Sequence, residues 1–463
     1  MAASDEAAAT AKYFADLIQD KPIRFGYAEG KGKALFAPTE FSAGQAIFSE
    51  VPLVAMQHRA NRSTTQGCDN CFAVVGTIED QVAHLLSIGT EAVPTVPVAL
   101  KEPTSSSSFQ HETTIVSCAC GDIYCSKACQ VAAWERYHCL LCPAHPDTPM
   151  QAFVDYSTGR DAVTCRRTTT SSPDSTPPSA MIYVFPTETN EIFLLAAQVL
   201  CSIVVRYAVS PDMADARRPV DVFCKLPWWE VVAVNAELEE GQTLDEYCSI
   251  FRDLLEYTLS LFLHGLKFNV NHLVIHDNHP DPDSCFLATV DLDGAMEACE
   301  AAGVFDLDFF AQVVGMFEMN NISLEIRHPL NHIIMEEHHP DTSQEVMTWL
   351  ATVSATVQAK LELDHPHTEE DGEEVDGWEF PDLDGTALFS LICMMNHSCT
   401  PNVAVTYETG VATVVALDDI SAGDELCISY IDTDLDVDDR QAELSEYHFA
   451  CTCDRCNEEL MLQ

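Results

Sequence analysis

GTALFSLICMMNHSCTPNV (residues 385–403), GDELCISYIDTD (423–434) and EYHFACTCDRC (446–456) lie close together near the C-terminus. Apolar runs in the first two stretches, separated by polar and Gly or Pro turns, are typical of short β-strands. The third stretch holds three cysteines in the run CTCDRC, and thiols at such spacing predict a metal site. A tetrahedral site would need a fourth ligand from elsewhere in the chain.

Strand-like sequence also marks the other end of the chain. IRFGYAEGKGKALFA (23–37) and GQAIFSEVPLVA (44–55) alternate short apolar runs with Gly30, Gly32 and Gly44. This punctuation is typical of short strands joined by tight turns. Both ends of the chain are therefore predicted to form β-structure.

The middle of the chain has a different pattern. Residues from about 188 to 360 contain long apolar-periodic segments that predict helices. The apolar run Ile192–Val205 is interrupted by Gln198 and is shorter than the roughly 20 residues of a membrane span, so a buried helix is expected. The polar segment 166–180 and the acid-rich segment 361–384 predict solvated loops.

A cysteine-rich block separates the first strands from the helical middle. Its eight soft ligands form four pairs that suit two tetrahedral zinc sites, because a pair on a tight turn gives two ligands to one ion. The pairs are Cys68 and Cys71, Cys118 and Cys120, Cys125 and Cys129, and His138 and Cys142. Eight such ligands leave no open position for catalysis, so the block is expected to present a binding surface. Thr104–Ser108 within it predict a mobile loop.

The composition limits the partners and the compartment. The chain has 463 residues, of which 47% are apolar, enough for a sizeable core in several folding units. Its acidic start, MAASDEAAATAKYF, lacks the pattern of a secretory signal, which predicts a nuclear or cytoplasmic protein that is not secreted. The 73 acidic and 23 basic residues disfavour nucleic acid and would attract a basic protein. Alternatively, the acids serve solubility.

Together these stretches resemble the signature of SET-domain lysine methyltransferases. YCSKACQVAAWERYHCLLC (124–142) is similar to a MYND zinc finger. The chain is thus identified by resemblance as a member of the family of lysine methyltransferases with SET and MYND domains. The likeness covers both ends of the chain well and residues 145–380 poorly.

The resemblance implies an α+β protein, with a mostly β SET fold split by an inserted MYND module. The implied parts are the N-terminal part of the SET domain (21–60), the MYND zinc finger (61–145), a helical SET insertion (146–360), the core SET domain (361–440) and a zinc-bound post-SET segment (441–463).

The resemblance also implies about three zinc ions. Their ligands would be Cys68, Cys71, Cys125 and Cys129; Cys118, Cys120, His138 and Cys142; and Cys399, Cys451, Cys453 and Cys456. Only Ala119 separates Cys118 from Cys120, where the family commonly has two residues. Cys139 is left as a buried thiol or a substitute ligand.

The implied activity is transfer of methyl groups from S-adenosylmethionine to a lysine of a basic protein, such as a histone or a ribosomal protein. Such catalysis is mostly positioning of the amine against the methyl group. By resemblance, Tyr430 lies at the transfer point and Tyr447 walls the lysine channel. The implied cofactor-binding residues are Lys31, Gly32, Lys33, Asn320 (or Asn321), Asn396, His397, Tyr430 and Phe449.

Two departures from the family pattern bear on this activity. Ala34 replaces a usual second glycine in the opening segment, and Phe389 stands where several relatives have tyrosine. Loss of a hydroxyl from the channel would remove a water-binding partner and change how many methyl groups are added. The alternative function is a catalytically silent adaptor that binds peptides through its MYND module.

Overall fold

The computed structural model describes residues 2–101, 115–159, 191–234, 236, 238, 241–271, 286–331, 344–364 and 380–461. The loops expected around Thr104–Ser108 and over 166–180 lie outside these residues.

Helices dominate the middle of the chain. The α-helices are α1 (Ala2–Leu17), α2 (Ile78–Leu86), α3 (Val98–Lys101), α4 (Lys127–Ala133), α5 (Cys139–Leu141), α6 (Met150–Ser157), α8 (Ile192–Val209), α9 (Met213–Asp221), α10 (Trp228–Val231), α11 (Leu244–Asn271), α13 (Leu292–Ala301), α14 (Leu307–Asn320), α16 (Gln344–Asp364), α17 (Val437–Ser445) and α18 (Asp454–Met461). Shorter helical turns are η1 (Asn61–Ser63), η2 (Thr90–Ala92), η3 (Trp134–His138), η4 (Phe286–Thr289) and η5 (Ile392–Met394).

Within the described residues, the strands form four small sheets. They are β1 (Arg24–Ala28), β2 (Gly32–Phe36), β3 (Ala46–Glu50), β4 (Val54–Gln57), β5 (Val116–Ser117), β6 (Ile123–Tyr124), β7 (Ile322–Ile326), β8 (Leu383–Leu388), β9 (Asn396–His397), β10 (Val403–Tyr407), β11 (Ala412–Ala416) and β12 (Glu425–Ile428). The sheet orders are β1-β2-β12-β9, β10-β11-β3, β4-β8-β7 and β5-β6. This combination of helices and small sheets confirms the predicted α+β class.

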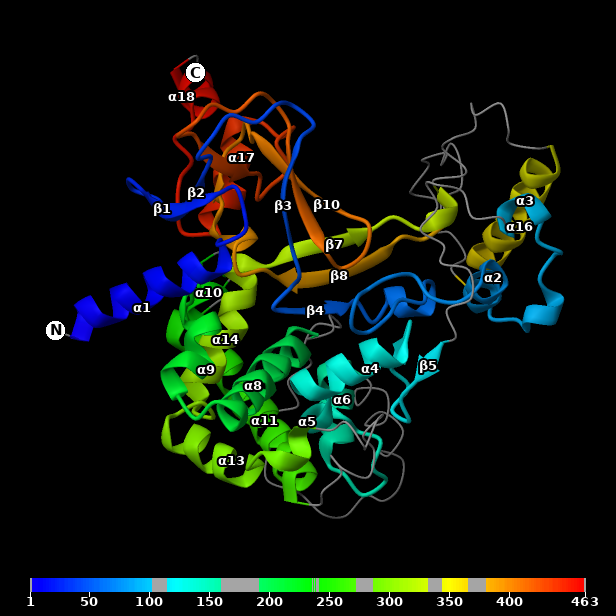
Figure 1. The fold of residues 1–463 in the computed structure, drawn as a ribbon, viewed down its shortest axis with the longest axis horizontal. Helices are drawn as coiled ribbons and strands as arrows, with labels where there is room; N and C mark the ends of the chain where they lie inside the picture. Colours follow the sequence, from blue (N-terminus) through cyan, green and yellow to red (C-terminus); the bar gives the residue numbers. More distant parts are fainter. Residues whose placement is uncertain are drawn as a thin grey trace.

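Three of the sheets join the two ends of the chain. Strand β2 pairs with β12, β3 with β11 and β4 with β8, each pair antiparallel. The apolar residues of β2 drive one of these pairings, because Ala34 and Leu35 are fully buried there. Figure 1 shows the blue N-terminal strands beside the orange and red C-terminal segments.

One strand interrupts the segment expected to be helical. The helices of the predicted insertion (146–360) give way at Asn320 to β7, which pairs with β8. Within ISLEI, Leu324 and Ile326 are buried and alternate with exposed Ser323 and Glu325, the period of a strand. The insertion is therefore not purely helical.

The acid-rich loop expected over 361–384 also needs correction at both ends. Helix α16 continues to Asp364, and β8 begins at Leu383. Phe380 and Leu383 are buried apolar side chains, and they hold the chain against the core where β8 begins. The many acids around them led the sequence to predict a loop here. Residues 365–379 lie outside the described part of the chain.

Helix α8 is the one helix among the described residues that is long and apolar enough to cross a membrane. All residues from Phe193 to Val205 are buried within the protein, where α8 packs against α9, α13, α14 and η3. The predicted buried helix is therefore confirmed.

Figure 1 shows α8 among the other helices, while α2, α3 and α16 stand together to one side. These three helices share their own small hydrophobic cluster.

Glu50 ties the end of β3 to the turn that precedes the NHSC motif. Its carboxylate accepts hydrogen bonds from the backbone N–H groups of Leu391 (2.9 Å) and Ile392 (3.0 Å). Ile392 begins η5, which leads directly to β9 and the motif. Burial raises the pKa of Glu50 from 4.5 to about 7, although these hydrogen bonds oppose the rise.

This raised pKa predicts a pH dependence of stability. A carboxyl group whose pKa is higher in the folded state stabilises the fold below pH 4.5, and this contribution is lost as the pH rises through about 7. Between pH 6 and 8 the wild type should lose about 1 kcal/mol of unfolding free energy relative to Glu50→Gln, which cannot titrate.

Thermal denaturation of both proteins across that pH range would measure the difference. Glu40→Gln, which changes an exposed carboxylate, is the matched control and should follow the wild type. Parallel pH profiles for wild type and Glu50→Gln would contradict the prediction.

Candidate active site and metal sites

Four aromatic rings meet where the strands from both chain ends converge. The ring of Tyr430, just after β12, lies 5.2 Å from Tyr447, 5.5 Å from His397 and 6.3 Å from Phe449, measured between centroids. Tyr447 and Phe449 follow α17, and His448 between them has a left-handed backbone with φ of +63°. Histidine is among the residues that adopt this conformation more readily. The post-SET segment thus supplies two rings to a cluster built on the strands.

The hydroxyl of Tyr430 has a fixed orientation. It donates a hydrogen bond to the carbonyl oxygen of Met395, at 2.7 Å. Burial raises the pKa of Tyr430 well above its usual value of 10, so the phenol is neutral at physiological pH. A neutral, oriented phenol can align a reacting group by hydrogen bonding but does not act as a strong base.

His397 connects the aromatic cluster to a cysteine. Its Nδ1 accepts a hydrogen bond from the backbone N–H of Tyr430 (3.1 Å), which places the ring proton on Nε2. Nε2 lies 3.3 Å from the sulfur of Cys399. Burial, together with the positive charges of Lys31 and Arg440, lowers the pKa of His397 to about 4. The imidazole is therefore neutral and fixed in one tautomer.

The opening loop is joined to the NHSC motif through Glu425. The carboxylate of Glu425 pairs with Lys31 Nζ (3.0 Å) and accepts a hydrogen bond from Asn396 Nδ2 (2.7 Å). The same Asn396 nitrogen donates to the carbonyl oxygen of Lys33 (3.0 Å). Gly32 has a φ of +89°, and no heavy atom lies within 4 Å of where its Cβ would be. This conformation favours glycine and leaves open space beside the loop, as a bound ligand would require.

A cavity of about 660 Å³ lies on another side of Tyr430. Tyr430 and Tyr447 line it together with Asn320 and Asn321. The side-chain amide of Asn320 donates to the carbonyl oxygens of Cys224 (2.7 Å) and Met316 (2.8 Å). Of the sequence-predicted site residues, Tyr430 and Tyr447 are thus shared by the cavity and the aromatic cluster. Glu425 joins Lys31 to Asn396, and Asn396 in turn donates to the backbone carbonyl of Lys33.

The predicted zinc ligands come together in three groups of four, and within each group the ligand atoms all lie within 4.8 Å of one another. The groups are Cys68, Cys71, Cys125 and Cys129; Cys118, Cys120, His138 and Cys142; and Cys399, Cys451, Cys453 and Cys456. Sulfur atoms around a tetrahedral zinc lie about 3.8 Å apart, given Zn–S bonds of about 2.3 Å. The donor set and spacing therefore fit a metal ion in each group.

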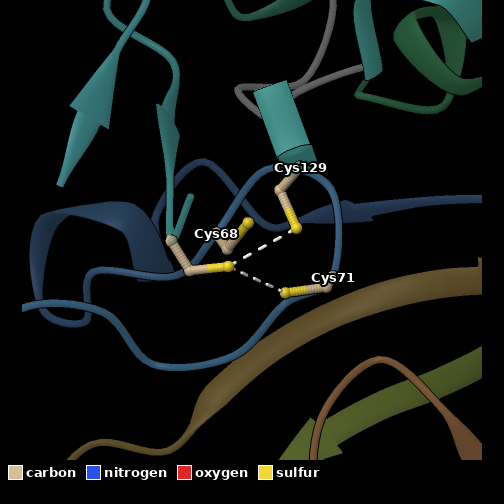
Figure 2. Close-up of side chains that lie close together, drawn as sticks. Cys68, Cys71 and Cys129 are labelled. Carbon is tan, nitrogen blue, oxygen red and sulfur yellow. Dashed lines mark hydrogen bonds between the residues drawn. The ribbon is translucent and has the colours of Figure 1, made fainter. Parts of the chain in front are cut away.

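The first group is shown in Figure 2, where the sulfur atoms of Cys68, Cys71 and Cys129 point toward one another. The sulfur of Cys125 lies 3.6 Å from that of Cys71 and 3.4 Å from that of Cys129. These distances match the edge of a tetrahedral thiolate site.

The second group includes both members of the closely spaced pair. Cys118 lies 3.6 Å from Cys142 between sulfur atoms, and Cys120 lies 3.6 Å from His138 Nε2. The shortened spacing across Ala119 therefore does not keep either cysteine out of the group. The Nδ1 atom of His138 faces Asp122 at 3.5 Å, an arrangement that orients a metal-binding imidazole.

The third group joins Cys399 of the NHSC motif to the C-terminal cysteines, with Cys399 and Cys456 sulfur atoms 3.4 Å apart. The side chain of Arg440 is fully buried beside it. Its Nη2 atom lies 3.7 Å from the sulfur of Cys456 and 2.6 Å from a carboxylate oxygen of Glu459. A buried guanidinium requires nearby negative charge, which thiolates here would supply.

A family model of the SET domain matches residues 32–431, which is most of the chain. The chain belongs to the SET-domain family. It is 26% identical to histone-lysine N-methyltransferase ATXR2 of Arabidopsis thaliana, over 92% of this chain and 88% of that protein. It is 24% identical to protein-lysine N-trimethyltransferase SMYD5 of Mus musculus, over 92% of this chain and 84% of that protein.

A shorter match has higher identity. N-lysine methyltransferase SMYD2-B of Xenopus laevis is 46% identical over 74 residues, 16% of this chain and 17% of that protein. Together with the SET-domain match, these relatives confirm the resemblance to lysine methyltransferases with SET and MYND domains.

The two departures from the SET family pattern occupy different surroundings. Ala34 lies within strand β2, opposite Gly26, and is fully buried. It is therefore two residues away from Gly32, where the backbone is left-handed. Phe389 is fully buried next to Tyr407, with ring centroids 6.4 Å apart. The substitution at residue 34 therefore leaves the open space at the turn in place.

Several site residues were not found from the sequence. Glu425 holds the opening loop to the NHSC motif, Arg440 adjoins the third cysteine group, and Tyr407 and Cys393 line the cavity. For Glu425, the sequence offered one signal, which is an acidic residue at the start of an apolar strand. The other three look like ordinary core or surface residues until the chain folds.

We expect Arg440→Met to weaken retention of a metal ion by the third group, because the buried charge beside its thiolates would be lost. Loss of such an outer partner typically lowers metal affinity by about tenfold or more. Release of metal to a chromogenic chelator would measure the effect, as faster loss of one ion per chain.

Arg252→Met is the control for that experiment, since Arg252 is half-exposed and contacts Asp308 and Trp229 away from the cysteines. Identical release of all ions from wild type and Arg440→Met would show that the guanidinium has no such effect.

Proposed function

We propose that this protein transfers methyl groups from S-adenosylmethionine to lysine side chains of a basic protein, such as a histone or a ribosomal protein. Its class, a SET-type protein-lysine methyltransferase, rests on the family match and on relatives similar along most of their length. The cofactor, the substrate and the metal ions are the proposal. The observation that carries it is the neutral, oriented phenol of Tyr430 between the aromatic cluster and the cavity.

Residues from both ends of the chain would hold the cofactor. When bound, S-adenosylmethionine supplies a sulfonium methyl group, whose bond to sulfur breaks as the lysine nitrogen forms its bond to carbon. Lys31, Glu425 and Asn396 fix the loop and motif against each other, and Gly32 leaves open space beside the loop. The ring of Phe449 is 38% exposed, which leaves a face available for stacking on an adenine.

The lysine amine must be neutral to act as a nucleophile, although its ordinary pKa is about 10.4. Entry into the cavity beside Tyr430 and Tyr447 would remove water from the amine, and desolvation favours its neutral form. The hydroxyl of Tyr430 is held by the carbonyl of Met395, so the transfer point is ordered before the substrate arrives.

Acidic groups around the cavity support a basic substrate. Glu325 lines the cavity, and Tyr447 has its pKa raised first by burial and then by nearby Glu446, Glu443 and Glu318. The whole chain carries a formal charge of −50. Such a field draws basic segments and weakens with salt. The name of the Arabidopsis relative, a histone-lysine methyltransferase, supports histones as one class of substrate.

We further propose zinc as the ion in each of the three ligand groups, with the two groups of the MYND module forming a peptide-binding surface. Thiolate and imidazole donors in closed sets of four favour zinc and leave no vacant position for chemistry. We propose that the protein acts in the nucleus or the cytoplasm, where a histone or a ribosomal protein would be its substrate.

Cofactor binding separates the enzyme from a catalytically silent adaptor. Calorimetry with S-adenosylmethionine should give a heat of binding for wild type and for Tyr430→Phe, because the loop and motif are intact in both. Radiolabelled methyl transfer to histone and ribosomal fractions should fall by about a hundredfold or more in Tyr430→Phe, since one aligning hydroxyl is removed.

Tyr257→Phe, which changes an exposed phenol on α11, should transfer as the wild type does. No heat of binding with the wild type would favour the adaptor. Equal labelling by wild type and Tyr430→Phe would remove Tyr430 from its proposed role.

Metal analysis tests the zinc proposal. Wild type should contain about three zinc ions per chain, and Cys399→Ser about two, because one ligand of the third group is lost. Cys224→Ser, which changes an exposed cysteine outside the three groups, should keep the wild-type content. An unchanged zinc content in Cys399→Ser would exclude Cys399 as a ligand.

A further inference from the structure

The tip of the hairpin formed by β10 and β11 rests on the loop of the first cysteine group. The backbone N–H of Gly410, at the tip, donates a hydrogen bond to the carbonyl oxygen of Cys71, at 2.7 Å. A Cβ atom on Gly410 would lie 2.6 Å from the Phe72 ring and 2.9 Å from that oxygen. The backbone of Gly410 is not left-handed, so the close approach requires a glycine here, and the conformation does not.

Phe72 has an unusual conformation at this contact. Its φ is +58°, in the left-handed region that a bulky side chain rarely adopts. Its backbone N–H donates to the carbonyl oxygen of Cys68 (2.9 Å), and its side chain is buried. Such a conformation persists only where the surrounding structure fixes it. A metal ion bound by Cys68 and Cys71 would fix the turn that leads into Phe72.

The same hairpin forms a wall of the cavity of Tyr430 and Tyr447. All residues of β10, from Val403 to Tyr407, line that cavity, and Leu417 just after β11 lines it too. Within the described residues, β10 is an edge strand of its sheet, with β11 as its one neighbour. The position of the hairpin tip therefore affects the shape of the cavity.

We propose that the first cysteine group positions this wall of the cavity through Cys71 and Gly410, so that metal binding by the group and substrate binding at the cavity strengthen each other. This inference rests on the proposed methyltransferase function. The turn, once it holds a metal ion, fixes the hairpin tip, and the tip aligns β10 beside the lysine substrate. Because coupling between two binding sites is reciprocal, a bound substrate slows loss of the ion. Cys71 and Gly410 are positioning residues, since neither touches the reacting atoms.

Hydrogen–deuterium exchange tests the contact without methyl transfer. Gly410→Ala should exchange residues 403–416 about fivefold faster than the wild type, because the added methyl group pushes the tip away from Cys71. Cys129→Ser should have the same effect, although Cys129 lies outside the contact, because it removes a ligand from the group. Exchange over β1 and β2, which belong to another sheet, should match the wild type in both variants.

Gly89→Ala is the matched control for the added methyl group. Gly89 has an ordinary φ of −74°, and the atoms nearest to its Cβ would be the side-chain carboxylate of Glu91, which can move away. The hairpin should exchange in this variant as it does in the wild type. Wild-type exchange of the hairpin in Gly410→Ala or in Cys129→Ser would overturn the inference.

Kinetics with core histones test the effect on the substrate. Gly410→Ala should raise KM for histones about fivefold and leave kcat within about twofold of the wild type. The wall moves in this variant, whereas Tyr430 keeps its hydrogen bond to Met395. A lower kcat with unchanged KM would indicate loss of folded protein and would contradict a positioning role.

Metal release tests the reciprocal effect. Saturating core histones should slow loss of one ion per chain from the wild type to a chromogenic chelator by about fivefold, and should have no such effect on Gly410→Ala. Equal release with and without histones that the wild type methylates would overturn the inference. A wild type that binds S-adenosylmethionine but labels neither histone nor ribosomal fractions would count against the proposed function instead, and hydrogen exchange would still decide whether the group holds the hairpin.

Discussion

The pairing of β2 with β12 is the contact on which the rest of the site depends. Leu35 faces Leu426 across this pair, although most of the sequence lies between them. Glu425 is on the same strand, so the pairing carries its carboxylate to Lys31 of the opening loop and to Asn396 of the NHSC motif. Closing so long a loop costs chain entropy, and the burial of apolar residues on both strands offsets that cost.

Short-range patterns in the sequence predicted the features that depend on neighbouring residues. Alternating apolar residues predicted the N-terminal strands, and spacing picked out the eight ligands of the first two groups and three cysteines of the third, whereas Cys399 came from the family resemblance. Features that depend on tertiary pairing were missed or wrong. Strand β7 exists because β8 offers it a partner, and Phe380 is buried at the end of a segment whose acids predict a loop. Glu425 likewise acquires its role only through Lys31, which is far away in sequence.

His397 makes the third cysteine group and the aromatic cluster one unit. One ring nitrogen faces the sulfur of Cys399 and the other accepts the backbone N–H of Tyr430. Because Tyr447 and Phe449 lie between α17 and the last three cysteines, a metal ion there would hold the C-terminal end of the segment that carries these rings. Direct contacts would therefore couple the order of the aromatic cluster to metal binding by the third group.

The separation of β4 from β8 along the chain affects how the protein folds during its synthesis. Val54 pairs with Leu388, so at about 5–20 residues per second the first strands leave the ribosome roughly 17–70 s before their partner. The eight candidate metal ligands of the cysteine-rich module all lie within 68–142, so both of its groups can assemble during that interval. The early strands, with their apolar faces and unpaired edges, are then the part of the nascent chain that most needs a chaperone.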